Sequence, residues 1–315
     1  MGDAQLDGLI RQVSNWGRWG SEDELGTVNL ITPERRRAAA SLVRQGAIFS
    51  LAIPFNLEGV PQLPVTRRIN PHHWMLQTGT DLCAGVQAGA VGGWGYADEV
   101  VAMATHAATH WDGLAHSFYE YKMYNDRDCA LVSAAGAAQN DIVPISSQLV
   151  ARGVLLDFPR MLGAESLALD HRISISEIET AFEREGVESL PGDVLLMRTG
   201  NMGRATHRGG WEDYAGTDEP GFGIEVLPWL QEHDVAAVAM DNWGFEALPS
   251  GNPTIWLPVH AVAIVHMGLL LGENFMLDAL AEDCALDGVY EFLFTGLPLP
   301  LSGAVAGPVH PAAVK

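Results

Sequence analysis

Apolar runs alternate with amphipathic segments through the second half of the chain. Residues 153–158, 193–199 and 235–240 are almost continuously apolar, which is typical of strands whose two faces are both covered. Between the first two runs, residues 176–179 have the spacing of a helix capping box, and Gly186 is placed to end that helix. This pattern predicts an α/β fold in which helices cover both faces of a sheet.

The first half of the chain is less regular. Thr32 followed by Pro33 predicts the start of a helix that continues through residues 36–43. Residues 48–55 are rich in strand-forming side chains and predict a strand.

Two later stretches show neither a helical nor a strand period. Residues 67–75 contain two arginines, two histidines and Trp74, and they form either the wall of a substrate pocket or a surface loop whose charges pair with nearby acids. Residues 85–95 contain five glycines, which predict a mobile or tightly turning loop whose Trp94 would cover a pocket.

Three histidines and a carboxylate gather between residues 106 and 116. His106 and His110 are four residues apart, so a helical turn or a tight loop would place them on one side; Asp112 and His116 follow. Two imidazoles and a carboxylate are the donors that a divalent transition metal prefers. Each residue alone could be an ordinary buried polar group, but four desolvated polar groups so close together are costly unless something binds them.

Two polar residues late in the chain lie among apolar neighbours. His260 falls within residues 258–264, and Glu273 follows shortly before a helical pattern at residues 277–285. A lone histidine there is usually a satisfied core residue, whereas a carboxylate in such a setting needs a counter-charge or a metal. Together, His260 and Glu273 would supply the distal ligands that the first cluster lacks.

Composition and charge indicate the number of domains, the partners that are disfavoured and the expected location of the protein. The 315 residues contain no low-complexity tract, linker or repeat, so we expect a single domain spanning residues 1–315. The formal charge of −21, with Lys122 and Lys315 as the only lysines, disfavours nucleic acid and anionic membranes as partners. The scattered cysteines, together with the lack of a signal-peptide pattern and of a membrane-spanning apolar run, favour a cytoplasmic protein.

The segment from residue 106 to residue 116 closely resembles the signature HxGTHxDxxxH of the metal-dependent cyclase family, which includes bacterial kynurenine formamidases and isatin hydrolases. The matching residues are His106, Thr109, His110, Asp112 and His116. Weaker similarity to the longer-chain branch of that family extends to residues 15–20, 192–196 and 271–274. The resemblance therefore covers nearly the whole chain.

This resemblance implies a swivelling β/β/α-type fold with a mixed sheet flanked by helices, in a homo-oligomer that is a dimer or a tetramer. It also implies one or two divalent ions, zinc or manganese. His106, His110 and Asp112 would bind the first ion, and Asp112 would share a second with His260 and Glu273. His116 would be the catalytic histidine.

Two positions depart from the family signature. Ala108 stands where the family has glycine, so a left-handed backbone would be strained at this position. Leu114 stands where the family often has proline. Neither change removes a metal ligand, and we expect both to alter the shape of the substrate side.

We expect such a site to hydrolyse an amide, lactam or lactone of a small molecule, or to catalyse the reverse cyclisation. Metal-activated water would attack the carbonyl and His116 would transfer the proton. Thr109 would orient the water or a ligand, or would serve only as a turn residue. An aromatic or heterocyclic substrate is favoured by four tryptophans, Trp74, Trp94, Trp111 and Trp243.

Two other functions use similar ligands. Two histidines and a carboxylate also form the site of non-haem Fe(II) oxygenases. A complete ligand set without an open position would instead indicate a binding protein with a structural metal. The fingerprints of serine hydrolases, P-loop proteins and dinucleotide-binding proteins are absent, which disfavours those classes.

Overall fold

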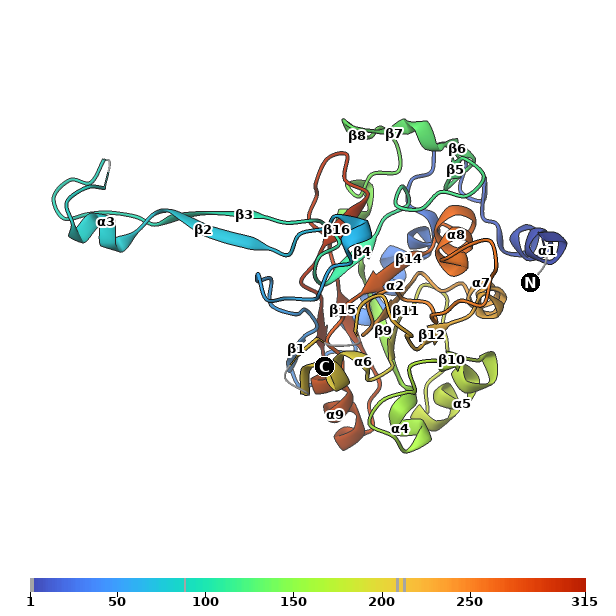
Figure 1. Ribbon diagram of the computed structural model, residues 1–315. Coiled ribbons are helices and arrows are strands. Elements are labelled where there is room, and N and C mark those ends of the chain that lie inside the picture. The colour runs from blue at the N-terminus through green and yellow to red at the C-terminus, as the bar shows by residue number, and fades with distance from the viewer. Residues whose placement is uncertain (1–2, 88, 208–209, 212–213) are drawn as a thin grey trace.

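A nine-stranded mixed sheet forms the centre of the molecule (Figure 1). The computed structural model describes residues 3–87, 89–207, 210–211 and 214–315. The strands of this sheet are β1 Ile48–Ser50, β4 His110–Asp112, β9 Val150–Asp157, β11 Val194–Arg198, β13 Ala237–Met240, β14 Leu270–Glu273, β15 Glu291–Thr295, β16 Ala306–Pro308 and β17 Ala312–Val314. Their order is β1-β17-β15-β9-β11-β13-β14-β4-β16. The four central strands, β9, β11, β13 and β14, are parallel, and the flanking strands pair antiparallel.

Helices pack on both faces of this sheet. The α-helices are α1 Asp3–Val13, α2 Pro33–Ala40, α3 Gly79–Cys83, α4 Phe158–Leu162, α5 Ile175–Glu185, α6 Asn201–His207, α7 Leu227–Glu232, α8 Pro258–Val262 and α9 Asp278–Asp287. A π-helix, η6 Ala263–Met267, continues α8. Short 3-10 helices are η1 Gly26–Leu30, η2 Pro64–Thr66, η3 Cys129–Leu131, η4 Pro144–Ser147 and η5 Ile224–Val226. None of the described helices is both long and apolar enough to cross a bilayer.

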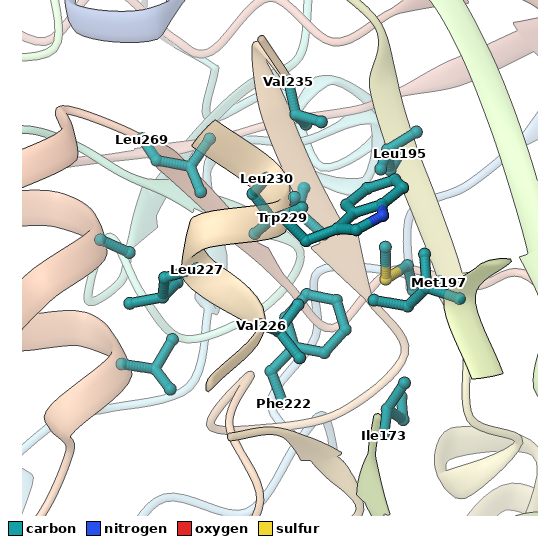
Figure 2. Packing of buried hydrophobic residues seen from close by; sticks show 14 of the residues in the cluster. Ile173, Leu195, Met197, Phe222, Val226, Leu227, Trp229, Leu230, Val235 and Leu269 are labelled. Carbon is teal, nitrogen blue, oxygen red and sulfur yellow. The ribbon is translucent and has the colours of Figure 1, made fainter. Parts of the chain in front are cut away.

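Alternate side chains of a strand point to opposite faces of the sheet, so the core lies in two layers. Leu195 and Met197 of β11 join one buried cluster with α5, α7 and α8, whereas Val194 and Leu196 join the other with α9. Figure 2 shows the first layer, in which Trp229 of α7 lies beside Leu195 and Met197. Apolar side chains on both faces of the central strands confirm the predicted covered sheet and its three predicted strands.

Four two-stranded sheets lie outside the large one. They pair β2 His72–Gln77 with β3 Asp98–Ala102, β5 Lys122–Met123 with β6 Arg127–Asp128, β7 Val132–Ser133 with β8 Gly136–Ala137, and β10 Arg172–Ile173 with β12 Gly221–Phe222.

The pair β2–β3 forms an arm that projects far from the body, with α3 near its tip (Figure 1). The prediction that residues 67–75 are irregular was therefore wrong from residue 72 onward. Most side chains of β2 are exposed on both faces, so no burial pattern marks this strand in the sequence. The glycine-rich stretch 85–95 connects α3 back to β3 within the arm.

Two details of the helices differ from expectation. The capping box of α5 is formed by Ser174 and Glu177, two residues earlier than predicted, because the same spacing of serine and glutamate occurs twice in succession. The cap of α2 by Thr32 is confirmed, although that helix ends at Ala40.

The backbone at Ala108 is not left-handed, so alanine introduces no strain where the family has glycine.

Gly272 of β14 has no room for a side chain. A Cβ atom there would lie 2.6 Å from the Cβ of Ala239 and 2.8 Å from ring carbons of Phe275 and Trp111. Because overpacking displaces neighbours, we expect Gly272→Ala to lower the free energy of unfolding by about 1–3 kcal/mol in chemical denaturation. Gly8→Ala in α1 is the control, since a Cβ at Gly8 meets nothing within 4 Å. Equal stability of the two variants would contradict this close packing.

Candidate metal centre

The pairing of β4 with β14 brings three ligand-type side chains together. Their register places His110 opposite Glu273 and Asp112 opposite Leu271. Because side chains alternate along a strand, His110 and Asp112 share one face of the sheet, and Glu273 lies on that face beside His110. Trp111 points to the other face, into the core. Two segments far apart in the sequence therefore build one buried polar cluster.

His106 and His116 flank β4 in the chain. A tight loop, rather than a helical turn, carries His106 to the cluster. Its Nε2 lies 3.5 Å from Asp112 Oδ1 and 2.9 Å from His116 Nδ1. His116 Nε2 lies 3.8 Å from Asp112 Oδ1. The side chain of His116 is 22% exposed, more than that of any other histidine in the cluster, so His116 lies on the open side.

α8 contributes His260, and Glu246 fixes the orientation of its ring. His260 Nε2 lies 3.3 Å from Glu273 Oε1 and 3.6 Å from Asp112 Oδ2. On the far side of the ring, Nδ1 donates to Glu246 Oε1 at 2.8 Å. Glu246 also accepts the backbone N–H groups of Val259 and His260. One carboxylate thus satisfies the first turn of α8 and leaves His260 Nε2 facing the cluster.

Two groups of ligand-type atoms share Asp112. The first comprises His106, His110 and Asp112, and the second comprises Asp112, His260 and Glu273; within each group these atoms all lie within 4.8 Å of one another. His110 Nε2 and both carboxylate oxygens of Asp112 are buried without a hydrogen-bond partner among the described residues. Unpartnered buried polar atoms are costly, which indicates that something else binds them.

The spacing of these atoms fits a metal ion. Ligand atoms held 2.0–2.2 Å from a tetrahedral ion lie about 3.3–3.6 Å from one another. His110 Nε2 lies 3.3 Å from Asp112 Oδ1 and 3.4 Å from Glu273 Oε2. These contacts are too long for strong hydrogen bonds and match the edges of such a polyhedron. The donor set of imidazoles and carboxylates fits one or two divalent ions.

Electrostatics in the cluster also favour a cation. Burial raises the pKa of Asp112, but the neighbouring histidines, His116 first, outweigh burial and hold that pKa well below its usual value. Burial lowers the pKa of His110, but Asp112 and Glu273 outweigh it and raise that pKa to about 9. Burial, followed by the charge of His116, holds the pKa of His106 well below normal. The buried carboxylates are therefore stable only with positive charge nearby, which protonated histidines or a metal ion supply.

Thr109 connects the strands around the centre. Its hydroxyl donates to the carbonyl oxygen of Asn274 at 2.6 Å and accepts the backbone N–H of Ile53 at 3.0 Å. The single hydroxyl hydrogen is therefore used within the fold. These bonds position β4 against the residue after Glu273, and a role of Thr109 in orienting water or a ligand stays a prediction.

Only one of the four candidate tryptophans lies beside the centre. Trp111 is fully buried on the opposite face of β4 and donates to the carbonyl oxygen of Gly296 at 2.9 Å. Trp74 of β2 and Trp94, which precedes β3, are exposed side chains of the arm. Trp243 packs in a buried cluster with Ala108. The expectation of a substrate contact was wrong for Trp111, which is buried in the core, and stays a prediction for Trp74, Trp94 and Trp243.

Two carboxylates that shape the centre were not predicted from the sequence. Glu246 orients His260, and Glu219 accepts the backbone N–H groups of Trp243 and Gly244. Burial raises the pKa of Glu219 well above its usual value, although the backbone N–H groups of Gly244 and Trp243 oppose this shift. Glu246 stands among apolar residues, as Glu273 does, and the same signal would have identified it.

Glu246→Ala tests how strongly ring orientation controls metal binding. Loss of a carboxylate behind a ligating histidine typically weakens metal affinity by about 10–100-fold, and we expect this for zinc or manganese in competition with a chromophoric chelator. Glu225→Gln is the control, because Glu225 is an exposed carboxylate on a neighbouring segment. Unchanged metal affinity in a folded Glu246→Ala protein would show that His260 is not a ligand.

Comparisons with known proteins agree with this geometry. The family model described as "Putative cyclase" matches residues 49–247. A crystal structure described as a novel cyclase is 36% identical, covers 96% of this chain and 100% of that chain, and superposes with a TM-score of 0.89.

More distant relatives share the fold. Isatin hydrolase A from Ralstonia solanacearum is 16% identical over 88% of this chain and 93% of that chain, with a TM-score of 0.62. An isatin hydrolase bound to the product analogue thioisatinate is 15% identical over 88% of this chain and 94% of its own, also with a TM-score of 0.62. No protein of curated function matches the chain. The swivelling, mixed α/β fold is confirmed, and the chain belongs to the cyclase family.

Proposed function

We propose that this protein is a metal-dependent hydrolase that opens an amide, lactam or lactone bond of a small molecule, or closes it in reverse. The observation that carries this proposal is the pair of ligand groups that share Asp112, with one open-sided histidine, His116, beside them. The fold shared with isatin hydrolases supports a hydrolytic reaction. Zinc and manganese both suit imidazole and carboxylate donors.

Different residues of the site have different roles in such a reaction. When bound, a divalent ion lowers the pKa of a water ligand to about 7 and polarises a carbonyl. His116 Nε2 takes the proton as water adds to the substrate carbonyl carbon. The same atom returns that proton to the leaving nitrogen or oxygen as the C–N or C–O bond breaks. Glu246 holds the ring of His260, and Thr109 holds the loop that carries His106 and His110.

A non-haem Fe(II) oxygenase is the second candidate, because His106, His110 and Asp112 form a group of two histidines and one carboxylate. The second group around Asp112 favours the hydrolase. Turnover with zinc or manganese under strictly anaerobic conditions would exclude the oxygenase. A structural metal with no open coordination position would instead indicate a binding protein.

His116→Ala separates catalysis from metal binding. We expect this variant to keep its metal, because His116 is outside both ligand groups, and to lose about 10²–10⁴-fold in kcat. Asp112→Ala should lose both metal and activity, and His310→Ala, an exposed histidine, should behave as the wild type. Metal content and hydrolysis of aryl formamides, cyclic imides and lactones provide the measurements. Equal metal loss in the His116 and Asp112 variants would make His116 a ligand.

We also propose that the chain forms a homo-oligomer through its arm. A two-stranded hairpin is only marginally stable alone in water, yet this one exposes many apolar side chains. They are Trp74, Met75, Leu76, Val86, Val91, Trp94 and Val101. Residues 72–97 contain a single charged side chain besides histidines, Asp81, in a chain of net charge −21; Asp98 and Glu99 follow at the start of β3. The stretch between the two strands therefore carries little of the negative charge that would keep two copies apart.

The double variant Val91→Glu with Trp94→Glu tests this association. We expect it to sediment as a monomer, because added charges at an apolar contact cost several kcal/mol on association, while the wild type sediments as a dimer or tetramer. Leu286→Glu is the control, since it places the same charge on an exposed apolar position of α9. A monomeric wild type, or an arm variant that sediments like it, would contradict the proposal.

A further inference from the structure

Arg68 is held beside the loop that carries His106. Gln62 Nε2 donates to the carbonyl oxygen of Ala107 at 3.1 Å, and the N–H of Ala104 donates to the carbonyl oxygen of Ile69 at 3.2 Å. These two bonds fix the segment around Arg68 against the residues on either side of His106. The position of Arg68 is therefore set by the fold of the metal-binding loop.

Among the residues that the structure describes, the guanidinium of Arg68 has no acidic partner. It lies over the ring of Trp243, 5.8 Å from the ring centroid, and makes no hydrogen bond or ion pair within the described part of the chain. Other arginines that are not fully exposed do have acceptors; Arg152 and Arg198, for example, each contact two carboxylates. In a chain with 39 acidic and 18 basic side chains, a half-buried arginine without a carboxylate needs an explanation.

The described residues that line the hollow beside Arg68 include no acidic side chain. Arg68 lines a hollow of about 380 Å³ with Leu57, Gln62, Ile69, Asn70 and His72. Trp243, over which the guanidinium lies, packs in one buried cluster with Ala108, which stands between His106 and His110. Arg68 therefore lies between this hollow and the loop that carries the candidate ligands.

We propose that Arg68 binds a carboxylate group of the substrate, so that the protein acts on carboxylate-bearing amides, lactams or lactones. The planar guanidinium offers two parallel N–H donors that match a carboxylate, and Trp243 holds its plane in place. A phosphate would carry nearly two negative charges, and only His72 accompanies Arg68 in the lining. The assignment of carboxylate-bearing substrates rests on the proposed hydrolase function. The proposal that Arg68 binds an anion does not depend on that function.

Binding of benzoate tests the anion site directly. The zinc-loaded and metal-free proteins are titrated with benzoate and with neutral benzamide in a calorimeter. We expect Arg68→Gln to weaken benzoate binding by about 10–100-fold, the range for a hydrogen bond to a charged group, and to leave benzamide unaffected. Arg67→Gln is the matched control, because it removes the same charge from an exposed neighbour. Benzoate bound directly to zinc is common to all three proteins and cancels in the comparison.

Hydrolysis assays distinguish the proposed anion site at Arg68 from the proposed hydrolase function. With cyclic imides prepared with and without a carboxylate substituent, Arg68→Gln should raise KM about 10–100-fold only for the carboxylate-bearing partner and leave kcat nearly unchanged. Equal benzoate affinity in the wild type, Arg68→Gln and Arg67→Gln, or no benzoate binding by the wild type, overturns the assignment of Arg68. Arg68-dependent benzoate binding without metal-dependent hydrolysis would reject the hydrolase and retain the anion site.

Discussion

Two buried carboxylates, Asp112 and Glu273, lie side by side where β4 pairs with β14. Like charges removed from water repel each other and lose hydration, so this arrangement persists only with positive charge between or around them. The carboxylates raise the pKa values of His110 and His260, and the ring nitrogens of these two histidines and of His106 converge on the same small volume. The local structure around the sheet edge follows from this single constraint.

Packing in the core holds the junction of β4 and β14 in place. Trp111, on the opposite face of β4, packs against Phe275 and Phe294 and anchors the strand in the core. Gly272 allows β14 to approach that ring. Thr109 then ties the start of β4 to the residue after β14, and Glu246 accepts backbone N–H groups at the start of α8. Rigid packing on one face of the sheet thereby fixes the positions of polar side chains on the other face.

The sequence predicted the parts of the structure that depend on local pattern. The central strands have near-continuous apolar runs, and the ligand-type residues of the first cluster lie within eleven positions, so both were visible without coordinates. The pairing of His110 with Glu273 depends on strand register between distant segments, which no local period encodes. The arm was missed because both its faces are exposed and a strand of that kind has no alternation of hydrophobicity. Trp111 was misplaced because an aromatic ring serves the core and a pocket equally well.

Asp112 belongs to both ligand groups, and this sharing has a thermodynamic consequence. An ion in the first group would change the charge and orientation of the carboxylate that the second group uses. The free energy by which binding in one group alters binding in the other is the same in either direction, so two bound ions would behave as a linked pair rather than as independent sites. The sign of this linkage, set by one shared residue, would decide whether the second ion binds more tightly or more weakly than the first.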